Sequence, residues 1–380
     1  MRGVGSGLET AMAEEVGRAA IRSASKADEP KMLELLFRAF QRWPAFPIQV
    51  PAFEHLRWKM RSDPIAAKHH FVAEIDGRIV AMMIRIVRRV RVRGRSSLAR
   101  DGVDAAVDPR YQGRGLYGAV LDHSQEVLQG ADYGLGFWYS SNPRTRRRSR
   151  PEEWNSLGNA IQVLQKPYDA RGIVARRREK YGGRLPAPLA VLRIELEKAV
   201  NRLLHPPYWG RARGDWSIAA LERFDDRISE FFDEAARPFD FIVARSADYL
   251  NWRYCDPAAG RFTVRVVEQE GRLLGYSVLK VAEGEGYIAE LLALPGRSDV
   301  VRTLIEDALR IFRAAGVDRV TCWMITRHPY NGILRRYGFL DSRTDVGFGY
   351  NPVDLTASEL EFLKDPWARI HLTHGDSDWV

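Results

Sequence analysis

Three short segments in the first half of the chain recur in the same order in the second half, and this repeat constrains the fold more than any other feature. The pairs are Leu56-Arg57-Trp58-Lys59 with Leu250-Asn251-Trp252-Arg253, Gly77-Arg78-Ile79 with Gly271-Arg272-Leu273, and Phe137-Trp138-Tyr139 with Cys322-Trp323-Met324. The first two pairs share one separation, 194 residues. One coincidence of this kind is unremarkable, but three in order predict a duplicated domain.

The length and composition agree with two globular domains. A chain of 380 residues can bury two ordinary cores, and its 45% hydrophobic and 28% charged content is typical of globular proteins. No run of about 18 apolar residues is present, so we expect no membrane span, and Met1–Glu15 lacks the apolar core of a secretory signal. Cys255 and Cys322 lack a CxxC partner, which is typical of buried thiols in a reducing compartment. We therefore predict a cytoplasmic protein without a metal site.

A strand, a glycine-bearing turn and a helix are predicted over residues 103–128. The strand Val103–Val107 should end at Asp108-Pro109, because proline cannot donate to a sheet ladder. After Gln112-Gly113-Arg114-Gly115, apolar residues from Leu116 to Leu128 recur with helical spacing. Glycines at the mouth of a helix let backbone N–H groups face an anion, and Arg114 adds a cation. Gly-x-Gly alone is typical of ordinary turns, but this setting favours a phosphate site.

This stretch resembles motif A of the GCN5-related N-acetyltransferase (GNAT) superfamily, Gln/Arg-x-x-Gly-x-Gly/Ala after a strand ending in Val-x-Pro. Gln112, Gly115 and the Val107/Pro109 lead-in match, whereas Tyr117 takes the third small position and Gly118 comes one residue late. The resemblance implies that the turn binds the pyrophosphate of acetyl-CoA, which serves as a cosubstrate. The implied cofactor contacts are Ala105, Ala106, Val107, Gln112, Gly113, Arg114, Gly115, Leu116, Tyr117, Gly118 and Asn142.

The order of the other elements also resembles the GNAT family. A strand near residues 20–24, a helix opening at Asp28-Glu29-Pro30 and a hairpin about Asp76-Gly77 precede the turn. We therefore predict an α/β fold with a mixed α+β sheet: two tandem GNAT-like domains, each a mostly antiparallel twisted sheet flanked by helices. The predicted bounds are a leader at 1–18, GNAT domain 1 at 19–170, a linker with one helix at 171–213, GNAT-like domain 2 at 214–352 and a tail at 353–380.

The second copy differs at the turn. It has Pro295-Gly296-Arg297-Ser298-Asp299, which lacks Gly-x-Gly and places an acid where a phosphate would sit. Like charges repel, so we predict that domain 2 keeps the fold with a degenerate cofactor site and that domain 1 is catalytic. Many GNAT members carry a tyrosine acid before a closing Gly; here Leu334 and Trp154 occupy the matching positions.

Two residues of domain 1 are candidate catalytic groups. The resemblance places the oxyanion donor on the backbone near Ala105–Val107, and Asp104 on the same strand is the candidate general base. Tyr139, on the neighbouring strand, is the candidate acid for the leaving thiolate. The competing interpretation of Asp104 is a polar residue that faces solvent. We interpret the arginines of the segment 78–93 as the solvent-exposed face of a strand. The alternative is a row of basic side chains that faces a ligand.

Three functions follow from the sequence. The first is an acetyl-CoA-dependent N-acetyltransferase, an acyltransferase that modifies a primary amine of a small molecule or peptide. The second uses aminoacyl-tRNA on the same fold, which the net charge of +9 permits. The third is a non-catalytic acyl-CoA-binding protein, which the missing tyrosine acids support. The basic segment 140–150 contains no aromatic residues on which bases could stack. A nucleic acid is therefore the least favoured of the partners considered.

Overall fold

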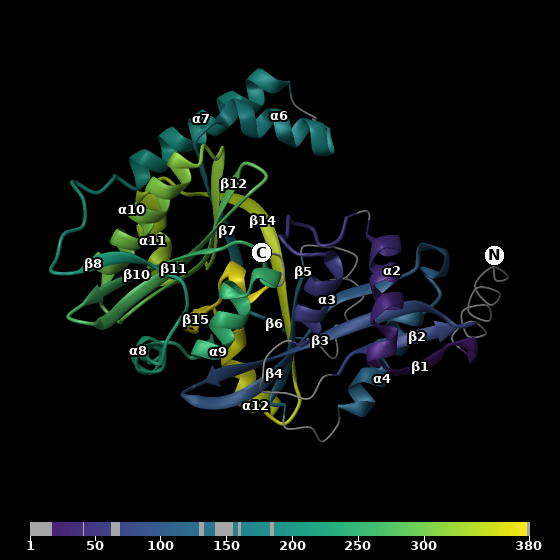
Figure 1. The fold of residues 1–380 in the computed structure, drawn as a ribbon. Helices are drawn as coiled ribbons and strands as arrows, with labels where there is room; N and C mark the ends of the chain where they lie inside the picture. The colour runs from purple at the N-terminus through teal and green to yellow at the C-terminus, as the bar shows by residue number, and fades with distance from the viewer. Residues whose placement is uncertain are drawn as a thin grey trace.

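The computed structural model describes residues 17–40, 42–61, 69–128, 133–140, 155–158, 161–182 and 186–377. Two halves, each built on a twisted sheet, lie side by side, and a helical hairpin projects from the second half (Figure 1). Within the described ranges, no helix is both long enough and apolar enough to cross a membrane.

The first half contains the elements that the sequence predicted around residues 20–140. They are β1 (Ala20–Ser23), α2 (Glu29–Ala39), α3 (Ala52–Met60), β2 (Phe71–Ile75), β3 (Arg78–Val92), β4 (Arg95–Val107), α4 (Leu116–Val127), β5 (Leu135–Ser140), β6 (Asn155–Ser156) and β7 (Ile161–Pro167). Pro30 stands in the first turn of α2, where its missing N–H costs nothing, and Met32, Leu35 and Leu36 form the buried face.

Two helices, α6 (Ala170–Tyr181) and α7 (Ala187–Leu204), form the projecting hairpin, where the sequence predicted one helix. The second half then repeats the first. Its elements are β8 (Ser217–Leu221), α8 (Arg227–Ala235), β9 (Phe241–Val243), α9 (Ala247–Leu250), β10 (Thr263–Gln269), β11 (Arg272–Ala282), β12 (Glu285–Ala293), α10 (Ser298–Ala314), β13 (Arg319–Ile325), α11 (Pro329–Arg336), β14 (Leu340–Pro352), α12 (Ala357–Leu360) and β15 (Ile370–His371).

The two sheets are joined by an exchange of strands. The strand order is β1-β2-β3-β4-β5-β14-β7-β13-β12-β11-β10-β8. β7, from the first half, lies between β13 and β14, while β14, from the second half, pairs with β5. The predicted fold of two related halves with mixed, mostly antiparallel sheets is confirmed.

The repeated tryptophans lie on a pseudo-twofold axis between the halves. Trp58 and Trp252 stack with ring centroids 4.9 Å apart. Each indole N–H donates to the backbone carbonyl of the other residue, at 2.9 Å from Trp58 and 3.3 Å from Trp252. A contact in which residue i meets j and j meets i is characteristic of twofold symmetry. The spacing of 194 residues therefore reports a duplication whose copies face each other.

The first hairpin turn has the same geometry in both copies. Asp76 and Gly77 have φ of 48° and 75°, and Glu270 and Gly271 have φ of 49° and 78°. Two successive positive φ values define a type I′ turn, which matches the twist of the flanking strands. The Asp-Gly hairpin prediction is thus confirmed in the first half and holds in the second.

The prediction that the arginines of β3 face solvent is wrong for two of them. Arg85 and Arg88 are buried, at 6% and 1% exposure. Arg85 donates to Ser124 Oγ at 2.6 Å and Arg88 to Asp101 Oδ2 at 2.9 Å. A sequence pattern shows which side chains alternate, but the helix and the strand that cover them are set by the tertiary structure.

The C-terminal residues pack inside the molecule. β15 pairs in parallel with β9, which itself pairs with β3 of the first half. Residues 370–377 are all buried. The segment assigned to a tail therefore connects the two halves, and the domain bounds themselves remain predictions.

Candidate active site

β4 and β5 form a fork. They pair in parallel only at Ala99–Leu135, Arg100–Gly136 and Asp101–Phe137. Beyond Asp101, β4 continues on β3, whereas β5 continues on β14. No strand in the described part of the chain pairs with the β5 side of residues 102–107. Such an edge offers backbone N–H and C=O groups to an extended ligand.

A β-bulge lies at the fork. Met82 pairs with Ala106 and Ile84 with Val103, so Asp104 and Ala105 stand opposite the single residue Met83. Asp104 adopts φ of 47°, a left-handed conformation that is uncommon for a residue with a side chain. A bulge removes backbone groups from the ladder and turns them in a new direction. The N–H groups of Ala105 and Ala106 are therefore candidates to bind an oxygen atom placed in the fork.

The Asp104 carboxylate is held by two donors. Lys59 Nζ lies 2.7 Å from Oδ2, and Trp43 Nε1 lies 3.0 Å from Oδ1. The side chains of Lys59 and Asp104 are 4% and 11% exposed, so the pair is largely removed from water. Because both oxygens already accept hydrogen bonds, the geometry favours a carboxylate that fixes the bulge over one that removes a proton.

The glycine turn opens α4 toward solvent. Gly113 and Gly115 have φ of 82° and 81°, which side chains rarely adopt, and residues 112–115 are exposed. Gln112 Nε2 donates to Val107 O at 3.2 Å and so ties the turn to the end of β4. A Cβ atom at Gly113 or Gly118 would meet nothing within 4 Å. The first N–H groups of the helix lack intrahelical partners and can bind an anion there.

Tyr139 lies on the other arm of the fork. Its ring packs against Phe348 at 5.1 Å and Phe137 at 5.7 Å between centroids. Its hydroxyl is buried and has no hydrogen-bond partner among the described residues. Burial, reinforced by the negative charge of Asp376, raises the pKa of Tyr139 well above its usual value. The hydroxyl therefore stays protonated and can act only as a proton donor.

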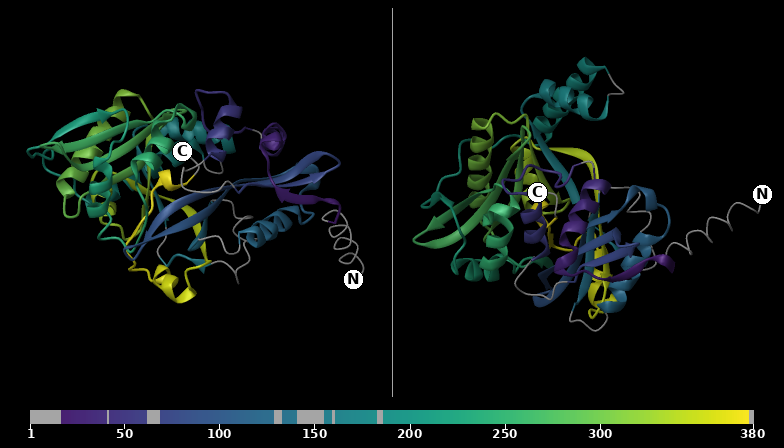
Figure 2. Two further views of the ribbon diagram at one scale, coloured as in Figure 1. Left: turned by 60° about the horizontal axis from the view of Figure 1, so that its bottom comes forward. Right: turned by 45° about the vertical axis from the view of Figure 1, so that its right-hand side comes forward.

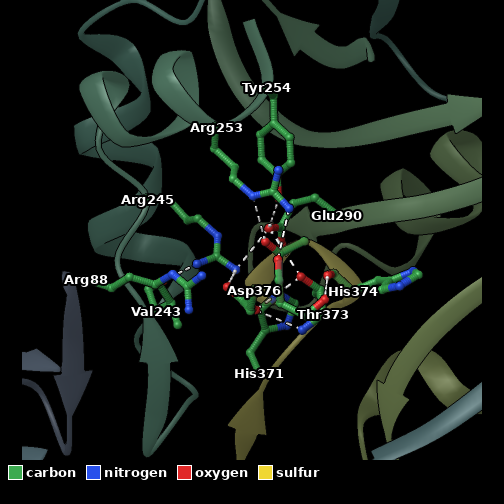
Figure 3. Close-up of polar contacts among 12 residues, drawn as sticks. Arg88, Val243, Arg245, Arg253, Tyr254, Glu290, His371, Thr373, His374 and Asp376 are labelled. Carbon is green, nitrogen blue, oxygen red and sulfur yellow. Dashed lines mark hydrogen bonds and ion pairs between the residues drawn. The ribbon is translucent and has the colours of Figure 1, made fainter. Parts of the chain in front are cut away.

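A buried charged network lies in the second half, with Arg88 of β3 beside it (Figure 3). Asp376 Oδ1 lies 2.8 Å from the Arg245 guanidinium, which also lies 2.9 Å from Glu290 Oε2. All three side chains are fully buried. Arg253 donates to the carbonyls of Gly375 and Ser377 at 3.1 and 2.9 Å and so holds the C-terminal segment in place. Although burial alone would raise the pKa of Glu290, Arg245 and His371 lower it to about 2.

Two histidines extend this network, and their hydrogen bonds fix their protonation. Tyr330 N–H donates to His328 Nδ1 at 3.1 Å, so the proton of neutral His328 is on Nε2. That nitrogen lies 3.0 Å from His371 Nδ1, which must then accept. His371 Nε2 can only donate to Glu290 Oε1, at 3.4 Å. Burial lowers the pKa of His328 well below its usual value, so this imidazole is neutral.

The structure gathers most of the predicted site residues at two adjoining places. Asp104, Ala105, Ala106 and Val107 lie at the fork, Gln112, Gly113, Arg114, Gly115, Leu116, Tyr117 and Gly118 at the mouth of α4, and Tyr139 on β5. Asn142, Trp154 and most of the basic segment lie outside the described residues. The sequence did not reveal Arg88, Arg245, Glu290 and Asp376, which are far apart in the chain. The one available signal was an arginine inside the apolar segment of β3.

Comparisons with known proteins place this geometry in context. Residues 20–149 match the acetyltransferase (GNAT) domain family. Saccharomyces cerevisiae N-myristoyltransferase, solved with myristoyl-CoA and inhibitors, shares 14% identity over 88% of this chain and 80% of that chain, with a TM-score of 0.59. A probable N-acyltransferase from Enterococcus faecalis V583 shares 12% over 89% and 73%, with a TM-score of 0.59. A GCN5-related N-acetyltransferase from Anabaena variabilis ATCC 29413 shares 11% over 89% and 74%, also at 0.59. At these identities the structures share the fold, and no curated protein sequence matches.

Proposed function

Because residues 20–149 match the acetyltransferase (GNAT) domain family and the fold is similar to that of N-myristoyltransferase, we propose that the protein is an N-acyltransferase that uses acetyl-CoA as its acyl donor. The observation that carries the proposal is the fork between β4 and β5, with the bulge at Asp104–Ala105 on one arm and the glycine turn directly after it. An extended thioester bound along residues 102–107 would bring its phosphates to the mouth of α4.

The chain supplies distinct groups for the two ends of the donor. Backbone N–H groups at Gly113–Gly118, together with Arg114, would bind the pyrophosphate. The N–H groups of Ala105 and Ala106 would hold the thioester oxygen, which gains negative charge as the amine attacks. Donors already fixed by the bulge need no reorganisation during the reaction, which is why such groups accelerate acyl transfer.

Tyr139 is the proposed acid. When the amine nitrogen bonds to the carbonyl carbon, the carbon–sulfur bond breaks, the nitrogen releases one proton to water and the thiolate takes up one proton. Tyr139 retains its proton because its hydroxyl is buried. Asp104 has a different proposed role from the general base suggested by the sequence: with Lys59 and Trp43 it holds the bulge in its left-handed conformation. It would act through the backbone of Ala105.

The test places one charge at the mouth of α4 without straining it. Gly118 lies in the first turn of α4, with a φ outside the positive range and open space around a Cβ atom. Gly118→Glu should therefore fold normally but repel the pyrophosphate, whereas Gly118→Gln has the same size and no charge. We expect calorimetric titration with acetyl-CoA to show affinity reduced by about tenfold or more in the Glu variant and much less in the Gln variant.

A second readout separates binding from catalysis. Release of free CoA thiol with a panel of primary amines should require the same turn that binds the donor. Equal affinity in both variants would place the donor elsewhere. Binding of acetyl-CoA without thiol release for any amine would favour the non-catalytic acyl-CoA-binding function. If acetyl-CoA does not bind the wild type, the aminoacyl-tRNA hypothesis would be favoured.

A further inference from the structure

The α6–α7 hairpin exposes an apolar stripe. Leu189, Leu192, Leu196, Val200 and Leu203 follow one another at helical spacing along α7, and each is 52–82% exposed. Leu204, the last residue of α7, and Trp209, beyond the helix, are also exposed, Trp209 to 97%. Isolated exposed leucines are normal, but a continuous row of this length marks a surface that binds a partner.

The same segment has a large excess of positive over negative charge. Residues 171–213 contain 11 arginines and lysines and three acidic residues, a net charge of +8, compared with +9 for the whole chain. Arg171, Arg177, Arg202, Arg211 and Arg213 are exposed, and none forms an ion pair with another described residue. This charge is therefore available to a ligand.

The hairpin projects from the second half, and its apolar stripe borders an open groove whose other wall includes Arg335, Leu340 and Arg343. Figure 1 and the right-hand view of Figure 2 show the hairpin extending away from both sheets. At its base a cavity of about 550 Å³ is lined by Arg177, Arg178, Arg193, Arg319 and Arg343, with Glu197 and Asp341 as its acidic residues. Space for an anionic group thus adjoins the apolar stripe.

We propose that the α6–α7 hairpin binds the surface of an anionic phospholipid bilayer. Amphipathic helices that lie in a membrane interface combine an apolar face of leucine and tryptophan with surrounding arginine and lysine. Both features occur together here, and a bilayer of acidic lipids uses both. The stripe inserts among the acyl chains at the interface while the arginines contact the headgroups.

The charge distinguishes this partner from two others. A second copy of the chain could cover the stripe, but it would bring another segment of +8 against the first, and the two would repel. A nucleic acid would neutralise the arginines, but it would leave five large aliphatic side chains exposed to water. Of these three partners, an acidic membrane surface satisfies both the apolar stripe and the positive charge.

The test is sedimentation of the full chain with vesicles of phosphatidylcholine alone and of phosphatidylcholine mixed with phosphatidylglycerol. We expect binding to the mixed vesicles only, weakening as salt is added. Leu192→Ser with Leu196→Ser should lower the partition coefficient by about tenfold or more for each leucine, with an unchanged melting temperature because both residues are already exposed. The apolar control is Val281→Ser, an exposed valine on β11 outside the hairpin.

A matched triple variant tests the charge. Arg171→Gln, Arg177→Gln and Arg202→Gln should weaken binding strongly. The control removes the same charge elsewhere through Arg223→Gln, Arg237→Gln and Arg261→Gln, three exposed arginines without ion pairs to other described residues. Equal losses in the two triples would overturn the proposal, as would absence of binding to the mixed vesicles. A dimer in sedimentation equilibrium that Leu196→Glu dissociates would also overturn it, in favour of a second copy.

Discussion

Lys280 is a buried amine whose removal should stabilise the protein. It lies on β11 at 3% exposure, and Nζ has no hydrogen-bond partner among the described residues. The nitrogen lies 3.5 Å from the ring centroid of Phe46 and 4.9 Å from that of Phe262. Burial, and then the nearby charge of Arg253, lower its pKa from 10.5 to about 7.

The lowered pKa of Lys280 determines how the stability of the protein depends on pH. The unfolded chain keeps the proton up to about pH 10.5 and the folded protein only up to about pH 7, so between them the unfolded state binds more protons and stability rises with pH. The shift corresponds to a penalty of about 5 kcal/mol, present in full below pH 7. Lys280→Met should therefore stabilise the protein by up to about 5 kcal/mol near pH 6 and by less than about 1 kcal/mol near pH 10.

Urea unfolding of the wild type and Lys280→Met at the two pH values measures both numbers. Lys280→Arg is the control, because it keeps a charge that burial cannot remove, and it should lower stability at both pH values. A Met variant that is less stable near pH 6, or whose gain does not change with pH, would refute the reasoning.

Two further predictions concern contacts that link distant parts of the chain. Lys59→Met leaves the Asp104 carboxylate buried without its cation and should lower the free energy of unfolding by about 3 kcal/mol. Adding Asp104→Asn should restore most of this loss. A double variant as unstable as Lys59→Met would contradict the prediction. Trp58→Phe and Trp252→Phe each remove one indole hydrogen bond across the pseudo-twofold axis and should each cost about 1 kcal/mol in urea unfolding, with a coupling energy of similar size between them. Strict additivity of the two losses would show that the rings do not act as a pair.

Local patterns predicted the features that depend on local chemistry. Asp76-Gly77 gave the hairpin because few other residues accept two successive positive φ values. Pro109 and the glycines that follow it gave the end of β4 and the start of α4. The spacing of Trp58 and Trp252 gave the duplication, since a repeat survives in residues that both copies need for the same contact.

The remaining features depend on contacts between distant segments, which no local pattern contains. In the sequence, Arg88 has the pattern of a solvent-facing arginine. Only the folded structure shows that Asp101 lies beside it. Asp376 and Glu290 are 86 residues apart in the chain, yet in the folded structure both pair with Arg245. The exchange of β7 and β14 pairs each strand with partners from the other half, and no pattern within either strand specifies those partners.

That exchange has a consequence for how the protein is made. When a ribosome has released residues up to the α6–α7 hairpin, β5 exists but its neighbour β14 has not been synthesised. β7 is also synthesised before its neighbours, because both β13 and β14 come from the second half. The first half therefore emerges with an exposed sheet edge and a spare strand, both of which invite pairing with another nascent chain. Synthesis of the second half ends this risk by supplying the missing neighbours, so a pause or truncation between residues 213 and 340 should be especially prone to aggregation.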